Sequence, residues 1–233
     1  MSKFNIIPYY RNIIANDEEQ KSLGYFDDCY EENEHFMLKM VCGSLDSNIV
    51  DKLSAMTLYS YINNDAFNSN AILVYFGCFA PFHDGHEYCI KSAISKIQET
   101  HNYIGGLIFP SHDNYILTKQ HMEIDELRNY RALLSRYGDI NTNSMIVDWF
   151  PTLLRGEINF PYLLYRAQAY VNRIEYLSRF DIFFVVGDDN KGFADIKQDN
   201  IIPIVVTRGG THNCDITYNP FYDVSSTKLR AKQ

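Results

Sequence analysis

The stretch FGCFAPFHDGHEY, residues 76–88, gathers side chains that can bind a phosphate. It follows the apolar run AILVYF and contains two glycines and two histidines: Gly77, Gly85, His83 and His86. A histidine ring donates a hydrogen bond and, when protonated, neutralises negative charge. If helical geometry begins here, the spacing of three residues places both rings on one face, within reach of one phosphate. The stretch therefore predicts an anion site at a strand-to-helix turn.

The glycines of this stretch suit such a site. Gly77 lets the chain turn and lets a ligand approach the backbone, and Gly85 keeps the space between the two imidazoles open. A helix that begins here presents unpaired N–H groups and the positive end of its dipole, which favour an anion. Ordinary packing explains the pattern less well, because both histidines, both glycines and Pro81 fall at one junction.

A second candidate site is DVSSTKLR, residues 223–230. It offers three hydroxyl side chains suited to a helix N-cap and two basic side chains: Ser225, Ser226, Thr227, Lys228 and Arg230. Alone, the stretch is explained as well by an ordinary N-capped helix with a basic end. Together with the first stretch it favours phosphate binding, because the charge of a triphosphate needs donors from two sides.

The elements that position these stretches alternate along the chain. Apolar strands are expected at 71–76, 103–109, 181–186 and 201–207, an apolar stretch at 144–150, and helices at 85–99, through 126–138 and within 162–180. Short, fully apolar strands that alternate with helices predict a parallel sheet covered on both faces. The expected fold is therefore α/β, a Rossmann-like doubly wound sheet.

The first seventy residues differ from this pattern. They contain an acidic, tyrosine-rich segment, a helix-like run at 51–62 and the polar segment 63–70, which is typical of a linker. We therefore expect an N-terminal extension of unknown role, residues 1–68, and a main domain, residues 69–233.

Composition limits the classes of partner. The chain has 233 residues, 46% of them hydrophobic, and a net charge of -8, so it should fold and should not bind nucleic acid or anionic membranes through broad electrostatics. No apolar run approaches the roughly 18 to 20 residues of a membrane span, and the N-terminus lacks the apolar core of a signal peptide. A soluble, intracellular, cytoplasmic protein is expected.

The five cysteines are scattered without a CxxC pair, so neither a metal site nor a disulfide framework is predicted.

The first stretch resembles the GxFxPxHxGH signature of the HxGH nucleotidyltransferase superfamily, which transfers AMP or CMP onto a phosphate. All of its positions are present: Gly77, Phe79, Pro81, His83, Gly85 and His86. DVSSTKLR resembles the second signature of that superfamily. Its form SSTKLR is more similar to the nicotinamide mononucleotide (NMN) adenylyltransferases than to the cytidylyltransferases, which usually carry two consecutive threonines.

The segments between the two signatures resemble eukaryotic-type NMN adenylyltransferases. They are GGLIFPSHDNYILTK, IVDWF, FFVVGDDN and IVVTRGG, so the resemblance covers about residues 71 to 230. It implies four catalytic residues: His83, His86, Lys119 and Arg230. The residues that it implies for ATP binding are Gly77, Cys78, Phe79, Gly85, Gly187, Asp189, Arg208, Ser225, Ser226 and Thr227. For NMN binding it implies Tyr115 and Trp149. Each middle residue alone suits an ordinary structural role, but their order along the chain favours the resemblance.

The resemblance implies that the NMN phosphate attacks the α-phosphorus of ATP, which forms NAD and pyrophosphate, with Mg²⁺ bound through the ATP phosphates. The partners are then ATP and NMN, and a homo-oligomer is compatible with the sequence. Two alternatives stay open: another adenylyl- or cytidylyltransferase of the superfamily, and a non-catalytic nucleotide-sensing module.

Two further expectations concern the surroundings of the site. No second aromatic is evident after the turn at Gly187 to stack opposite Trp149. The helix of the second signature is short, and isolated helices need about 12 to 15 residues to be stable. We therefore expect the N-terminal region to pack over that helix or to form an oligomer contact; a separate interaction module is the alternative.

Overall fold

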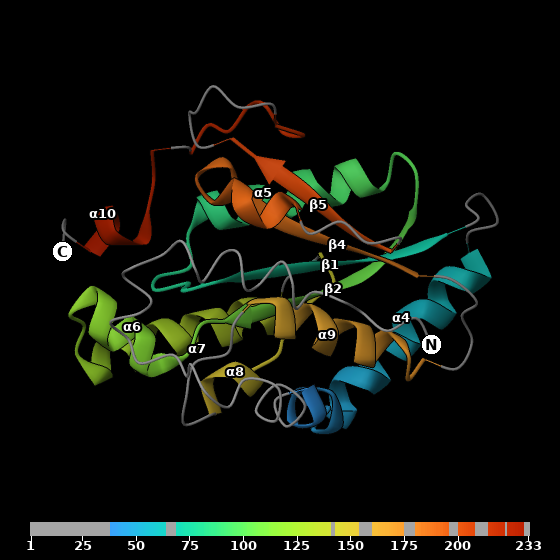
Figure 1. The fold of residues 1–233 in the computed structure, drawn as a ribbon, viewed down its shortest axis with the longest axis horizontal. Coiled ribbons are helices and arrows are strands. Elements are labelled where there is room, and N and C mark those ends of the chain that lie inside the picture. The colour runs from blue at the N-terminus through green and yellow to red at the C-terminus, as the bar shows by residue number, and fades with distance from the viewer. Residues whose placement is uncertain are drawn as a thin grey trace.

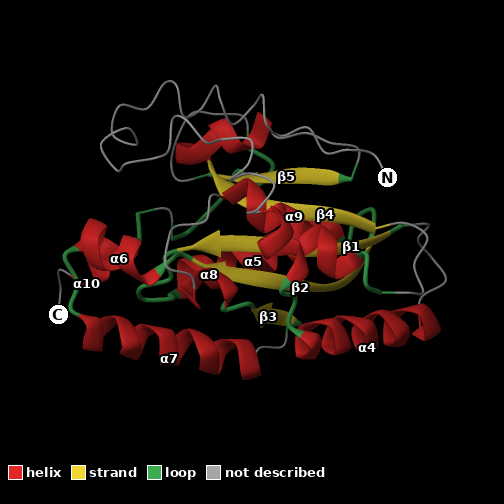
Figure 2. Cartoon of the chain, turned by 60° about the horizontal axis from the view of Figure 1, so that its bottom comes forward, coloured by secondary structure: helices red, strands yellow, loops and turns green. Residues whose placement is uncertain are grey.

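A computed structural model of the chain describes residues 38–63, 69–140, 143–153, 160–174, 180–195, 200–207, 214–221 and 223–230. Its centre is a five-stranded parallel sheet with the strand order β3-β2-β1-β4-β5 (Figures 1 and 2; β3 is labelled in Figure 2). The strands are β1 (Asn70–Gly77), β2 (Asn102–Pro110), β3 (Met145–Val147), β4 (Phe180–Gly187) and β5 (Ile201–Val206). The expected Rossmann-like α/β fold is confirmed.

Helices cover both faces of this sheet. They are α4 (Ser47–Asn63), α5 (Asp84–Ile97), α6 (Asp113–Gln120), α7 (Ile124–Ile140), α8 (Phe150–Leu153), α9 (Phe160–Val171) and α10 (Ser226–Arg230), with a 3-10 helix, η1 (Asp188–Asp195). Side chains along a strand point alternately to its two faces. Leu73 of β1 belongs to the same buried cluster as Ile90 of α5, whereas Val74 belongs to the cluster that contains Leu164 of α9. Burial on both faces is the reason why these strands are continuous apolar runs.

The strand order positions the site. The chain passes from β1 to β2 on one side and returns to β4 on the other, so the connections diverge at the carboxyl ends of β1 and β4. In open α/β sheets this switch point is where ligands bind. Gly77 ends β1 and Gly187 ends β4 at that edge.

Several boundaries differ from the sequence expectation. The helix expected within 162–180 ends at Val171, and residues 175–179 lie outside the described ranges. The apolar stretch 144–150 forms a strand of only three residues, β3, at the sheet edge. Helix α6 was not expected; His112 caps its N-terminus by accepting a hydrogen bond from the Asn114 N–H at 3.2 Å.

The N-terminal region contributes to the core of the sheet. Ile49 and Leu53 of α4 belong to the same buried cluster as Ile72 and Val74 of β1. Figures 1 and 2 both show α4 and α10 at opposite ends of the molecule, so this described part does not cover the C-terminal helix as expected. Residues 1–37 lie outside the described ranges, and the division at residue 69 stays a prediction.

Within the part of the chain that the structure describes, no helix has the length and apolarity needed to cross a membrane. Cys42, Cys78, Cys89 and Cys214 are thiols. Burial raises the pKa of Cys42 and Cys214, so neither is activated as a nucleophile.

Candidate active site

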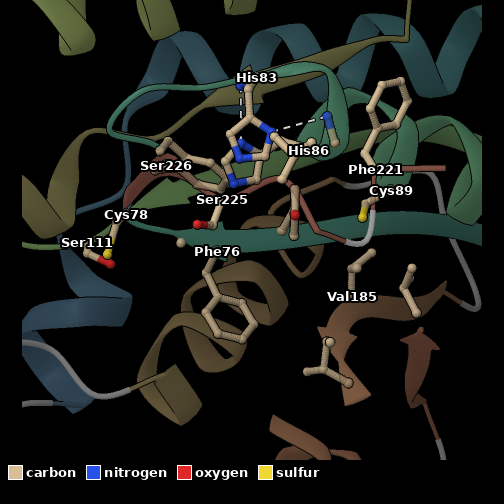
Figure 3. Close-up of a pocket in the computed structure, with 18 of the residues that line it drawn as sticks. Phe76, Cys78, His83, His86, Cys89, Ser111, Val185, Phe221, Ser225 and Ser226 are labelled. Carbon is tan, nitrogen blue, oxygen red and sulfur yellow. Dashed lines mark hydrogen bonds between the residues drawn. The ribbon is translucent and has the colours of Figure 1, made fainter. Parts of the chain in front are cut away.

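A pocket of about 400 Å³ lies at the carboxyl edge of the sheet and is called the crevice pocket below. Figure 3 shows that its walls come from both signature stretches and from the ends of β1 and β4. Residues that line it include Phe76, Gly77, Cys78, Phe79, His83, Gly85, His86, Ser111, Tyr115, Gly187, Phe193, Ser225 and Ser226. The structure thus brings together two stretches that are separated by most of the domain.

The two histidines form the cap of helix α5. His83 is the N-cap residue, and its Nδ1 accepts a hydrogen bond from the Gly85 N–H at 3.1 Å. The His83 N–H in turn donates to Nδ1 of His86 at 3.2 Å. Because Nδ1 is the acceptor in both rings, the neutral tautomer of each carries its proton on Nε2. Each imidazole is therefore a donor through Nε2.

The imidazoles are held in a fixed arrangement. Their ring centroids are 3.8 Å apart with an interplanar angle of 30° (Figure 3). Phe82 stacks on His86 at 5.3 Å, and Phe79 meets it edge-on at 5.1 Å. The sequence expectation placed both rings on one face of a helix, but His83 has extended backbone angles. The reciprocal cap, rather than helical spacing, brings the rings together.

Gly85 fits tightly against this pair. A Cβ on Gly85 would lie 3.0 Å from the His83 ring and 3.2 Å from Cβ of Phe221. Both distances are shorter than ordinary carbon contacts, so one neighbour would have to move.

We expect Gly85→Ala to lower the kcat of the reaction proposed below without destabilising the fold. Alanine is favoured over glycine within a helix by about 1 kcal/mol, which offsets the crowding. The displaced group would be the His83 ring, because it is a side chain at the pocket surface. We expect a roughly 10-fold loss of kcat, on the scale of the penalty for a misplaced donor. Turnover assays and thermal unfolding check this; equal kcat for variant and wild type would contradict it.

The loop between β1 and α5 is fixed through three of its carbonyl groups. Arg131 donates to Cys78 O, Arg230 donates to Ala80 O, and the Ser226 hydroxyl donates to Pro81 O. This support matters because Phe79 within the loop has a φ of 49°, a left-handed conformation that is unfavourable for a residue with a side chain.

The second signature stretch is therefore part of the support for the first. Helix α10 begins as expected, with Oγ of Ser225 accepting a hydrogen bond from the Lys228 N–H at 3.2 Å. Its end is anchored through Arg230, which also donates to the Thr227 hydroxyl at 3.3 Å. In the described part of the structure, the loop of residues 78–81 packs against α10. Residues 1–37 lie outside the described ranges, so a contact between them and α10 stays a prediction.

Most residues predicted for ATP line the crevice pocket: Gly77, Cys78, Phe79, Gly85, Gly187, Ser225 and Ser226, together with His83 and His86. Thr227 and Arg230 follow in α10. Lys119 and Asp189 lie in α6 and η1, but their side chains are outside the described part of the structure, as is all of Arg208.

Of the two residues predicted for NMN, one lines the crevice pocket. Tyr115 of α6 lines the crevice pocket. Trp149 follows β3 and is not among the lining residues; it packs against the buried cluster that contains Tyr75 and Phe79. The Arg131 guanidinium lies 5.9 Å from the centroid of its ring.

Sequence reasoning missed an aromatic wall of the pocket. Phe193 in η1 lines the pocket together with Phe76, and the two rings meet edge-on at 6.4 Å. Phe160 stacks on Phe76 at 3.6 Å. An aromatic residue, Phe193, does follow the turn at Gly187, and the 3-10 helix places its ring against Phe76 at the end of β1. The expectation that no ring stacks opposite Trp149 stays a prediction. The apolar residue amid the polar segment DDNKGFAD was the signal in the sequence.

The chain matches no family model and no curated protein. Among solved structures it is similar to Plasmodium falciparum nicotinic acid mononucleotide adenylyltransferase in complexes with APC and with NaAD, at 14% and 13% identity and TM-scores of 0.46 and 0.44. Each match covers 70% of this chain and 83% of that chain. A Vibrio parahaemolyticus protein, provisionally assigned as a nicotinate-nucleotide adenylyltransferase, matches at 16% identity and a TM-score of 0.41 over 70% of this chain and 85% of that chain. At these values the similarity carries no argument about the reaction, which has to be inferred from the site.

Proposed function

We propose that this protein is a nucleotidyltransferase that transfers AMP from ATP to NMN and releases NAD and pyrophosphate. The observation that carries the proposal is the histidine pair. Two stacked imidazoles, each with its proton on Nε2, line a pocket at the N-terminus of α5 and at the switch point of a parallel sheet. Donors and a helix dipole that converge in this way suit the charge of a phosphoryl group in transfer.

The reaction needs no nucleophilic side chain. The NMN phosphate attacks the α-phosphorus of ATP in line, a P–O bond forms, and the bond to the leaving pyrophosphate breaks. The protein supplies position and charge stabilisation. In this proposal His83 and His86 donate to oxygens of the transferring phosphoryl group. Ser225 and Ser226 contact the β- and γ-phosphates.

The remaining residues bind the outer parts of the substrates. Lys119 and Arg230 add positive charge at the phosphates, and Arg230 would do so from its anchored position against Ala80. Gly187, Asp189 and Arg208 are proposed for the adenosine side. Tyr115 and Trp149 are proposed for the pyridine nucleotide, with Phe193 as an aromatic surface that the sequence did not predict.

In this proposal Mg²⁺ enters the site bound to the phosphates of ATP. No group of three or more His, Cys, Asp and Glu side chains among the described residues could hold a metal ion. Among the described residues that line the crevice pocket, none carries a carboxylate. Mg²⁺ prefers oxygen ligands and keeps several waters, so the phosphate oxygens of ATP would hold it and it would neutralise their charge.

The decisive experiment offers the protein ATP and Mg²⁺ with NMN, and in parallel with nicotinic acid mononucleotide, and follows dinucleotide and pyrophosphate. CTP and other phosphorylated acceptors form a second panel. Equal amounts of NAD and pyrophosphate support the proposal. Turnover only with nicotinic acid mononucleotide would show that this nucleotide, and not NMN, is the acceptor. Turnover only with another nucleotide and acceptor would likewise replace ATP and NMN as the proposed substrates. Binding of ATP without turnover of any substrate pair supports the nucleotide-sensing alternative.

A further inference from the structure

Arg131 of α7 connects the ends of two neighbouring strands. Its Nη1 donates to the carbonyl of Cys78 at 3.1 Å, and its Nη2 donates to the carbonyl of Ser111 at 2.5 Å. Cys78 follows β1 and Ser111 follows β2, and both residues line the crevice pocket. The guanidinium thus bridges β1 and β2 at the edge of the sheet where the pocket lies.

The positive charge of Arg131 is balanced within this arrangement. Nε and Nη2 donate to one carboxylate oxygen of Asp113, at 3.0 and 2.9 Å. The Arg131 side chain is only 11% exposed, and burial lowers its pKa, while Asp113 acts in the opposite direction. Since the carboxylate and two carbonyls accept four hydrogen bonds from its five N–H groups, the guanidinium supplies a rigid planar geometry more than a charge for a ligand.

The bridge lies where the two strands diverge. The Ser111 N–H donates to the carbonyl of Gly77 at 2.8 Å. Beyond this bond β1 continues into residues 78–83, called the histidine loop below, while β2 continues into α6. Arg131 extends the connection past that point. A shift of the Cys78 carbonyl would move His83, at the end of this loop, and His86, in the first turn of α5, relative to α6, which carries Tyr115.

We propose that Arg131 is a positioning residue that fixes the histidine loop against α6, and so aligns the ATP phosphates with the attacking phosphate of the acceptor. This inference rests on the proposed function, in which the histidines contact ATP and α6 contacts the acceptor. In-line attack is sensitive to alignment, whereas the groups that bind ATP stay in the protein when Arg131 is removed. The effect therefore falls on kcat more than on KM.

The test compares Arg131→Met with Arg128→Met, a matched control on the same helix. Arg128 is 72% exposed, and the partner that it has among the described residues is its helix neighbour Asp125, at 2.8 Å. We expect Arg131→Met to lower kcat by about 10- to 100-fold, with less than a threefold change in KM for ATP. Arg131→Lys should recover little of the loss, because an ammonium is a point donor that does not reproduce the fork. Arg128→Met should match the wild type.

Hydrogen–deuterium exchange supplies a readout that does not depend on turnover. Arg131→Met should accelerate exchange in residues 77–83 and 111–116 and leave β4 as in the wild type; if it does not fold, Arg131→Lys serves in its place. The positioning role would be overturned if Arg131→Met left hydrogen exchange unchanged or accelerated it equally throughout the protein. It would also be overturned if Arg131→Lys had the kcat of the wild type, or if Arg131→Met changed only KM. A wild type that turns over no substrate pair, with the local acceleration present, would overturn the proposed function and support Arg131 as the residue that positions the pocket.

Discussion

Replacing His86 with asparagine is expected to lower the kcat of the proposed adenylyl transfer by about 100-fold or more, the scale of losing one preorganised donor. The carboxamide oxygen of the asparagine side chain can stand where Nδ1 of His86 stands and accept the His83 N–H, so the cap of α5 is preserved. The Nε2 donor has no counterpart in asparagine. A steady-state assay with ATP and the acceptor, beside thermal unfolding, measures the effect.

The control for this prediction is a histidine far from the pocket. His101 lies just before β2, at the opposite edge of the sheet, where its Nε2 is 2.9 Å from a carboxylate oxygen of Asp181. His101→Gln keeps a hydrogen-bonding group and should leave kcat unchanged. His86→Gln, whose amide nitrogen reaches further than that of asparagine, should retain more activity than His86→Asn. A near-normal kcat in His86→Asn would remove His86 from the proposed catalytic set.

Arg166→Met is expected to lower the free energy of unfolding by about 3 to 5 kcal/mol, the usual loss when one partner of a buried ion pair is removed. Arg166 is 1% exposed and Asp148 is 3% exposed, with Nε and Oδ2 at 2.5 Å. The Nη1 group of Arg166 also donates to the carbonyls of Val41 and Ser44, at 2.8 and 3.0 Å. Removal leaves a buried carboxylate unpaired and releases residues 38–44 from α9. Urea unfolding measures the loss.

Tyr170 is the other side chain that donates to Asp148 in this network, and it cannot compensate for the loss of Arg166. Its hydroxyl donates to Asp148 at 2.9 Å, and burial together with the Asp148 charge raises the pKa of Tyr170, so the donor stays protonated. One hydroxyl does not replace a guanidinium.

Two further variants separate the buried charge from lost packing. Arg166→Met combined with Asp148→Leu should be less destabilised than Arg166→Met alone, because no unpaired charge is then buried. The exposed pair of Arg128 and Asp125 provides the comparison, and Arg128→Met should unfold at the wild-type urea concentration. A loss below about 1 kcal/mol in Arg166→Met would show that water reaches Asp148.

The network of Arg166, Asp148 and Tyr170 also helps to position Trp149, the residue predicted from the sequence to contact the acceptor. Trp149 directly follows Asp148, whose Oδ1 accepts the Phe150 N–H at 2.9 Å. Arg166 also lies 3.9 Å from the centroid of the Phe150 ring. The start of α8, and with it Trp149, is thus tied to the N-terminal residues 38–46 through one buried cluster.

Local pattern determined the framework of this protein. The apolar runs of β1, β2, β4 and β5, the turn with both histidines and the cap of α10 depend on residues close together in sequence, so they can be predicted from it. The resemblance to the two nucleotidyltransferase signatures is of the same kind, because each signature is a contiguous stretch.

Only the tertiary structure decided which groups meet. Arg131 and Cys78 are 53 positions apart, and Arg230 and Ala80 are 150 apart, yet each pair shares a hydrogen bond. Phe193 joins the pocket wall, and Trp149 packs beside the Arg131 guanidinium, for reasons that no local pattern contains. Residue type determines which hydrogen bonds a side chain can donate or accept. Its partner depends on how the tertiary structure brings the strand ends side by side. Because an unsatisfied buried polar group is costly, folding selects the arrangement that pairs it.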